Sequence, residues 1–170
     1  MKKLPWLISA VCGLVLVITV KNLIFVQYTV DGVSMQPTIK EGKELRINRL
    51  SHRLNPIERF DIVVFYSPEK KESVVKRVIG VPGDEIVYKD DQLFVNGERV
   101  KEPFLKSIKE KQIEGSKLTG NFTLQETTGK THVPKDHLFV IGDNRLKSYD
   151  SRHFGFIKED RVIGKVKSKK

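Results

Sequence analysis

The apolar residues of this chain form one long amino-terminal run and several short runs after it. Residues 4–20 contain no charged side chain, and two lysines precede them. A second apolar stretch, residues 23–26, follows the polar pair Lys21 and Asn22. A helix needs about 20 apolar residues to cross the hydrocarbon core of a bilayer, and Lys21 can extend its charge toward the interface. The pattern therefore predicts an uncleaved transmembrane anchor in residues 1–26.

A cleaved signal peptide is the alternative interpretation of the same run. The charged start and the apolar stretch fit it, but residues 18–22 offer no cleavage site with two small residues. The positive start predicts that the amino terminus stays in the cytoplasm. The anchor would then contact membrane lipids, and residues 27–170 would form a domain on the outer side of the membrane.

The rest of the chain is typical of a β protein. The turn signal Asn96-Gly97 leads into residues 98–100 and predicts a type I′ hairpin. A polar stretch at about 100–135 contains glycines that mark turns, and we expect it to form a small inserted β lobe. The predicted fold is mainly β, with an antiparallel sheet. Runs rich in β-branched and aromatic residues predict its strands, and they are residues 61–66, 73–79, 85–88, 92–95, 138–141 and 161–166.

The composition limits the kinds of binding partner that we expect. Lys and Arg number 31 against 21 Asp and Glu, which gives a net charge of +10. The basic residues are scattered and no aromatic-and-basic motif accompanies them, so we expect no nucleic acid partner. A solvated basic surface attracted to anionic lipid or to the cell wall fits better.

The single cysteine, Cys12, lies in the apolar run and excludes an intrachain disulfide. A lipid-modified Cys12 is the alternative. The residues before it do not resemble a lipoprotein cleavage signal, and the apolar run continues past it.

Two residues stand out as candidates for chemistry. Ser34 lies in the segment Gly-Val-Ser-Met-Gln-Pro-Thr, and Lys76 follows two valines. A serine hydroxyl needs a base to become a nucleophile. A lysine can act as that base when burial lowers its pKa toward neutrality.

Three sequence blocks place this pair in a wider pattern. They are residues 34–38 (Ser-Met-Gln-Pro-Thr), residues 76–84, which start Lys-Arg-Val-Ile-Gly, and residues 142–152, which contain Gly-Asp-Asn-Arg and Ser-Tyr-Asp-Ser-Arg. In this order, behind an amino-terminal anchor, they resemble the bacterial type I signal peptidases. The resemblance implies a signal-peptidase-like antiparallel β domain and a membrane-anchored serine endopeptidase without a cofactor. Its substrates would be secretory preproteins, cut after small residues at positions −1 and −3 through an acyl-enzyme.

The resemblance also implies roles for single residues. Ser34 would be the nucleophile and Lys76 the general base, and the hydroxyl of Ser148 would orient Lys76. Gly32 occupies a position where some family members carry a serine that binds the oxyanion, so the backbone amide of Ser34 must serve that purpose here. Ion pairs would support the site, and their members are Arg77, Asp143, Asp150 and Arg152.

We expect shallow apolar pockets beside Ser34 and Lys76, the proposed catalytic dyad, for the substrate residues at −1 and −3. An extended peptide would lie along a strand edge there. Four residues near the motifs are candidates for the −1 pocket: Val30, Met35, Ile39 and Val75. Three others are candidates for the second pocket: Tyr28, Leu45 and Val64.

Other interpretations of these residues are weaker. A metal site at Asp143 and Asp150 would lack histidines and would face Arg145 and Arg152, so no metal is expected. The four histidines follow no nucleophile-and-base pattern. Two other functions stay open: a LexA-type self-cleaving Ser–Lys peptidase, and a non-enzymatic anchored domain that binds wall polymer or lipid. The sequence does not indicate an oligomeric state.

Overall fold

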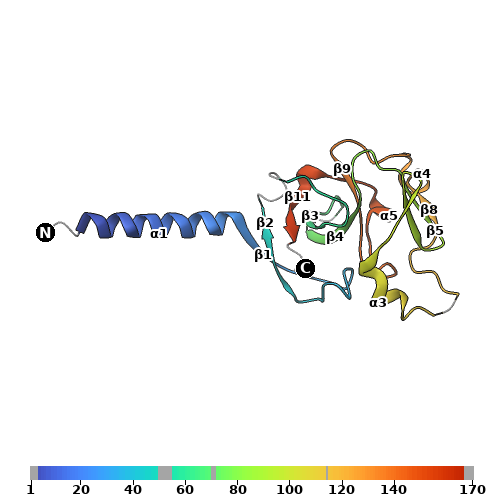
Figure 1. Cartoon of the computed structure of the whole chain (residues 1–170), viewed down its shortest axis with the longest axis horizontal. Helices are drawn as coiled ribbons and strands as arrows, with labels where there is room; N and C mark the ends of the chain where they lie inside the picture. Colours follow the sequence, from blue (N-terminus) through green and yellow to red (C-terminus); the bar gives the residue numbers. More distant parts are fainter. Residues whose placement is uncertain (1–3, 50–54, 70–71, 114, 167–170) are drawn as a thin grey trace.

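A long helix projects from a β-rich domain (Figure 1). The computed structural model describes residues 4–49, 55–69, 72–113 and 115–166. Helix α1 (Leu4–Ile24) runs directly into strand β1 (Phe25–Thr29), so Phe25 and Val26, predicted as the end of the anchor, lie in a strand. Within the described residues, no helix reaches the combination of length and apolar character needed to cross a bilayer. The predicted transmembrane anchor is therefore unconfirmed.

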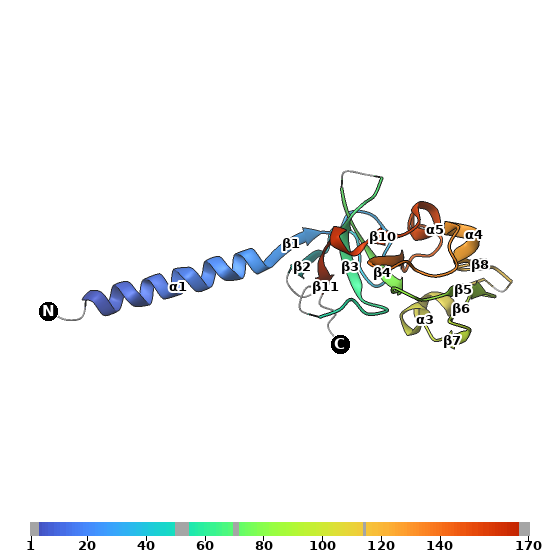
Figure 2. The same ribbon diagram turned by 90° about the horizontal axis from the view of Figure 1, so that it is seen from above.

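The main sheet has seven strands in the order β1-β2-β11-β3-β4-β9-β10, and each neighbouring pair is antiparallel. Four of its strands match the predicted runs. The order places the carboxyl-terminal strand β11 between β2 and β3, while β1 forms the edge beyond β2 (Figure 2). Besides β1, its members are β2 (Glu44–Asn48), β3 (Ile62–Tyr66), β4 (Ser73–Gly80), β9 (His137–Ile141), β10 (Ile157–Lys158) and β11 (Val162–Val166).

A smaller four-stranded sheet has the order β7-β6-β5-β8. Asn96 and Gly97 have φ angles of 52° and 82°, as the predicted type I′ turn requires. Asp90 and Asp91 also have positive φ, and they form the turn before this one. The strands are β5 (Ile86–Lys89), β6 (Gln92–Val95), β7 (Glu98–Val100) and β8 (Phe122–Thr123).

The inserted lobe differs from the prediction. Residues 86–100 supply most of the second sheet, and the 100–135 stretch contributes only β8 and the end of β7. Polar residues dominate the rest of that stretch and offer few apolar positions for strand pairing. It folds instead into short helical turns, η1 (Pro103–Leu105), α3 (Lys106–Lys109) and α4 (Leu124–Thr128). Two further turns follow β9: α5 (Ser151–Phe154) and η2 (Glu159–Arg161).

The two sheets share one apolar cluster. Ile79, Phe139 and Ile141 of the main sheet pack with Ile86 and Tyr88 of the smaller one, and each is at most 1% exposed. Burying apolar side chains of this size stabilises the fold by roughly 1.5–3 kcal/mol each. The strands β4 and β9 of the main sheet are thus packed against the smaller sheet, which fixes the loops at their ends.

Candidate active site

The side chains of Ser34 and Lys76 meet although 42 residues separate them. Ser34 lies in the turn after β1 and Lys76 lies on β4, and 2.8 Å separates Ser34 Oγ from Lys76 Nζ. The lysine nitrogen also lies 3.1 Å from the carbonyl oxygen of Val75. Only 4% of Lys76 is exposed, whereas Ser34 is half-buried. A serine hydroxyl within hydrogen-bond reach of a buried lysine has the geometry of an activated nucleophile.

Asn144 holds the turn that contains Ser34, residues 32–39, which we call the serine turn. Its backbone N–H donates to the carbonyl oxygen of Ser34 at 2.9 Å, and its side-chain amide donates to the carbonyl oxygen of Val33 at 3.1 Å. The sequence interpretation assigned no role to Asn144. Its position within the third block was the only available signal.

Gly142 lets these segments approach. A Cβ atom at this position would lie 2.2 Å from Ser148 Oγ and 2.5 Å from the carbonyl oxygen of Ser34. Backbone atoms cannot give way by that much, so a side chain here would displace the serine turn. The glycine that starts the third block is therefore a packing requirement of the dyad.

Gly32, the other glycine of interest, precedes Ser34 by two positions. Its φ of +85° lies in the left-handed region that side chains disfavour. Its N–H donates to Glu41 Oε1 at 3.2 Å. Gly32 thus shapes the turn.

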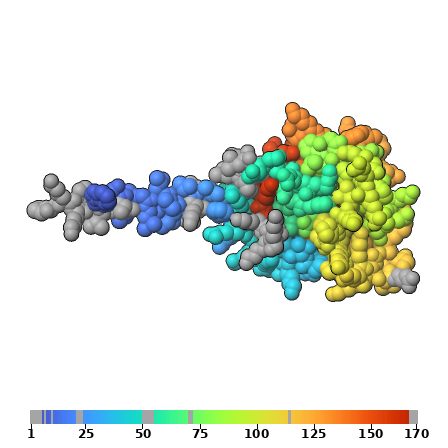
Figure 3. Space-filling view, viewed as in Figure 1, coloured from blue at the N-terminus to red at the C-terminus, as the bar shows by residue number. Residues whose placement is uncertain are grey.

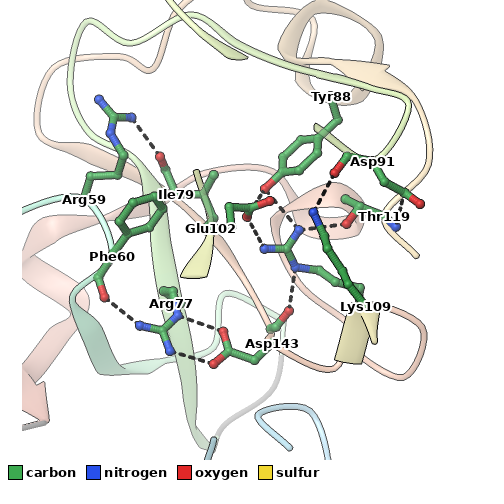
Figure 4. Close-up of polar contacts among 12 residues, drawn as sticks. Arg59, Phe60, Arg77, Ile79, Tyr88, Asp91, Glu102, Lys109, Thr119 and Asp143 are labelled. Carbon is green, nitrogen blue, oxygen red and sulfur yellow. Dashed lines mark hydrogen bonds and ion pairs between the residues drawn. The ribbon is translucent and has the colours of Figure 1, made fainter. Parts of the chain in front are cut away.

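Asp143 connects all three sequence blocks. It accepts two hydrogen bonds from the guanidinium of Arg77, at 2.8 and 2.6 Å, and one from the hydroxyl of Thr38 at 2.5 Å. Arg77 also donates to the carbonyl oxygen of Phe60 at 2.9 Å, and its guanidinium carbon lies 3.9 Å from the ring centre of Phe104. Figure 4 shows the fork-like pairing of Arg77 with Asp143. The pair is buried, with every charge compensated.

A second ion pair joins Asp150 to Arg152. The Arg152 guanidinium donates to both carboxylate oxygens, at 2.8 and 2.9 Å, and the N–H of Gly142 donates to Asp150 at 3.1 Å. Burial tends to raise the pKa of Asp150, but Arg152, the nearby Ser148 hydroxyl and the Gly142 amide outweigh it, and the pKa is lowered. Asp150 also caps α5. The predicted support residues therefore form two separate pairs.

Ser148 lies beside the dyad, packed against Gly142. Its Oγ is buried and makes no regular hydrogen bond within the described part of the chain, although it lies near enough to Asp150 to help lower that pKa. The orienting contact with Lys76 therefore stays a prediction.

A third buried polar cluster, which the sequence did not predict, supports the loop of residues 142–152. Arg145 forms an ion pair with Glu102, lies 3.1 Å from the hydroxyl of Tyr88, and donates from Nε to the carbonyl oxygen of Gly142 at 3.1 Å. Figure 4 shows the hydroxyl of Tyr88 pointing toward the carboxylate of Glu102. Burial raises the pKa of Tyr88. Burial alone would lower the pKa of Arg145, but Tyr88 and Glu102 raise it, so the guanidinium stays charged.

The seven candidates for the substrate pockets gather in one apolar cluster. Six of them are at most 5% exposed, and Tyr28 packs against them at the edge. Such buried residues can line the floor of a shallow pocket but not its rim. Ile47 and Ile62 belong to the same cluster and were not predicted. The role of the seven in substrate binding stays a prediction.

Among the described residues we find no metal-binding group and no histidine hydrogen-bonded to Ser34. They contain no group of three His, Cys, Asp or Glu side chains suited to a metal. His132, His137 and His153 contact Thr131, Lys135 and Asp150, respectively, and none of the three contacts Ser34. His52 lies outside the described residues.

Comparison with known proteins finds consistent similarities. The family model described as signal peptidase, peptidase S26, matches residues 3–169. Signal peptidase I V of Bacillus subtilis is 53% identical, and the match covers 98% of each chain. Signal peptidase IB of Staphylococcus aureus is 42% identical over 98% of this chain and 89% of its own length. The crystal structure of a signal peptidase I from Enterococcus faecalis superposes with a TM-score of 0.65 at 42% identity, covering 66% of this chain and 98% of the other.

The lowered pKa of Asp150 predicts a pH-dependent stability. A depressed folded-state pKa means that the carboxylate stabilises the fold above its unfolded-state pKa of about 3.9, and that this contribution is lost as the pH falls through the folded-state value. We expect Asp150→Asn to lower the free energy of unfolding at pH 7 by about 1.5–3 kcal/mol, because the amide keeps the shape and loses the charge. Urea unfolding at several pH values measures this.

The matched control is Asp160→Asn, because Asp160 is exposed. The gap between wild type and Asp150→Asn should narrow as the pH falls below about 4, where the carboxyl of the unfolded chain takes up its proton, and should close below the lowered folded-state pKa, where the folded wild-type carboxyl is neutral as well. A gap that stays constant from pH 7 to pH 2 would contradict the assignment.

Proposed function

Because the chain belongs to the peptidase S26 family of signal peptidases and removes signal peptides as a serine endopeptidase, we propose that Ser34 is its nucleophile and Lys76 its general base. The 2.8 Å separation of Ser34 Oγ from Lys76 Nζ carries this proposal. The burial of Lys76 supports it, because loss of water favours the neutral form of a lysine. Similarity over nearly the whole chain favours this function over a LexA-type peptidase or a non-enzymatic domain.

The reaction follows from the roles of the two side chains. The Ser34 hydroxyl donates its proton to the lone pair of Lys76 Nζ, and Oγ attacks the carbonyl carbon of the scissile bond. The resulting ammonium then protonates the leaving nitrogen as the C–N bond breaks. Lys76, neutral again, takes a proton from water as the water oxygen attacks the acyl carbon, and it returns this proton to Ser34 Oγ as the ester bond breaks. The carbonyl of Val75 supports this cycle by holding the nitrogen in place.

The oxyanion of the tetrahedral intermediate needs hydrogen-bond donors that are already in place. We assign the backbone N–H of Ser34 to this task, because Gly32 has no side chain and its own N–H donates to Glu41. The fixed serine turn, held by Asn144 at its carbonyl groups, supports the assignment.

Substrate selection in this proposal depends on the apolar cluster that contains Val30, Met35, Ile39 and Val75. These side chains are buried and packed together, and we expect them to form the floor of a shallow pocket that accepts only small residues at −1 and −3. Tyr28, Leu45 and Val64 would border the second pocket.

We further propose that α1 anchors the enzyme in the cell membrane with the catalytic domain on the extracytoplasmic side. The large apolar side chains that the structure describes in this helix, from Trp6 to Val20 without Leu7, are 44–83% exposed. Lipid would remove that apolar surface from water, a favourable transfer. In Figure 3 the helix stands clear of the domain, so an inserted helix would leave the domain at the membrane surface.

The proposed dyad predicts three inactive variants. Ser34→Ala and Lys76→Ala should each lower cleavage of a purified preprotein by ~10³-fold or more while the protein remains folded. Lys76→Arg should fail as well, because a guanidinium with a pKa above ~12 does not accept a proton near neutral pH. Circular dichroism checks folding. Activity retained in any of the three, with contaminating peptidase excluded, would refute the mechanism.

The pH dependence of kcat/KM tests the state of the base. The apparent pKa of its acidic limb should lie well below the ordinary lysine value of ~10.4, because Lys76 must be neutral before it can act as a base. Ser148→Ala should lower turnover by ~10²-fold through misplacement of the lysine, and should leave both the limb and the thermal midpoint nearly unchanged. The small stability effect is expected because Ser148 Oγ makes no regular hydrogen bond among the described residues.

The control for this experiment is a peptide substrate that has no groups titrating in the pH range of the measurement. A limb near 10.4 in the wild-type enzyme would mean that Lys76 is solvated and is not the base. A limb displaced by Ser148→Ala would mean that Ser148 tunes the lysine rather than positioning it.

The anchor predicts that the full-length protein resists carbonate extraction from membranes and keeps its original amino terminus. Val15→Asp should release much of it, because an acidic residue in mid-helix costs roughly 2.5–3.5 kcal/mol of insertion free energy. The variant should still cleave peptides in detergent. External protease should reach residues beyond 26 in cells without a wall. A soluble wild-type protein beginning near residue 20–30 would identify a cleaved signal peptide instead.

A further inference from the structure

A surface groove of about 630 Å³ adjoins the serine turn. Gln36 and Pro37, which follow Ser34 closely in the chain, line one side of it. Residues of α3 and of the segment after it also line the groove, and Asn144 and Leu146 contribute from the third block. Figures 1 and 3 show the loop after β1 beside the α3 segment. The mechanism described above makes no use of this groove.

Two apolar side chains of the groove are unusually exposed. Ile113 is 80% exposed and Leu146 is 73% exposed, the highest values among the large apolar residues described outside α1. Buried Leu118 also lines the groove. Apolar residues gathered around a hollow, rather than scattered singly, are typical of a binding surface.

The groove is connected to the dyad through Asn144. This residue lines the groove and also donates hydrogen bonds to the carbonyl oxygens of Val33 and Ser34. None of the seven residues predicted for the −1 and −3 pockets lines it. The serine turn therefore contributes Met35 to the buried apolar cluster and Gln36 and Pro37 to the groove.

A peptide that crosses Ser34 has two ends to accommodate. If its acyl side fills the −1 and −3 pockets, the chain beyond the scissile bond must continue away from them. An extended chain advances about 3.3 Å per residue, so its first few residues can reach a groove next to Gln36. The groove thus adjoins the part of the substrate that leaves with the amine.

The charges of the groove favour one kind of occupant. Lys111 and Lys117 line it, and no Asp or Glu is among its described lining residues. Both lysines are exposed and can pair with acidic side chains of a bound peptide. Electrostatic complementarity of this kind selects between partners more than it adds affinity.

We propose that this groove binds the first residues of the mature chain, those directly after the cleavage site, and that it prefers apolar and acidic residues there over basic ones. The proposal rests on the signal peptidase function and on the positions of the −1 and −3 pockets. It makes Ile113, Leu146, Lys111 and Lys117 determinants of substrate choice, because they contact the leaving segment and not the reacting atoms.

The test compares quenched fluorescent peptides with full-length enzyme in detergent. All share the sequence up to the first residue after the scissile bond. One ends there, one continues with apolar and acidic residues, and one continues with apolar residues and lysines. Wild type should have the highest kcat/KM for the acidic extension. The double variant Ile113→Ser, Leu146→Ser should lose about fivefold on the extended peptides and remain unchanged on the short one.

A charge reversal tests the preference separately. Lys111→Glu with Lys117→Glu should shift the ratio of kcat/KM for the acidic and lysine extensions by about fivefold toward lysine, and added salt should reduce the shift. The matched control, Lys89→Glu with Lys158→Glu, changes the net charge equally at exposed positions outside the groove, and should leave the ratio unchanged.

The outcomes separate this proposal from the proposed function. If wild type cleaves none of the peptides, the function itself is refuted. If wild type cleaves all three peptides and the groove variants affect the short and extended ones equally, the function stands and the groove does not bind the mature segment. The same conclusion follows if the control pair shifts the ratio as much as the groove pair.

Discussion

The buried carboxylate of Asp143 is the interaction on which the rest of the site depends. It binds Arg77 from β4 and Thr38 from the serine turn, so one side chain joins segments that lie 66 and 105 residues away in the chain. Removing one partner of a buried ion pair leaves an uncompensated charge and typically costs about 3–5 kcal/mol. Because Lys76 precedes Arg77 and Ser34 lies close to Thr38, the same interaction holds both members of the dyad at their distance.

The remaining polar clusters extend this support. Asp150, which is paired with Arg152, accepts a hydrogen bond from the N–H of Gly142, while Arg145 donates to the Gly142 carbonyl oxygen. Gly142 in turn allows the serine turn to approach where no side chain would fit. Buried polar groups of this kind specify one arrangement only when nearly all are satisfied. The second sheet takes part through Tyr88 of β5, which binds Glu102 and Arg145, and is therefore structurally coupled to the loop of residues 142–152.

The surfaces used in the proposed function are connected through the chain. The helix α1 leads into the edge strand β1 of the main sheet, and the serine turn after β1 contributes Met35 to the apolar cluster and Gln36 and Pro37 to the groove. In the proposed function, a substrate held at the membrane would meet these surfaces at fixed positions. Fixed positions of this kind reduce the entropy lost when the scissile bond is aligned.

The sequence by itself determined the parts of this protein that depend on local patterns. The strands rich in valine and isoleucine, the Asn96-Gly97 turn and the order of the three blocks follow from neighbouring residues and were predicted. The short strand β2 was missed although its burial alternates. The tertiary structure alone decided the contacts between distant segments: the partner of Asp143, the role of Asn144, the pairing of Glu102 with Arg145 and the crowding at Gly142. The physical reason is that hydrogen bonds and packing act over a few ångströms in space, and sequence spacing does not report which distant residues the sheets bring within that range.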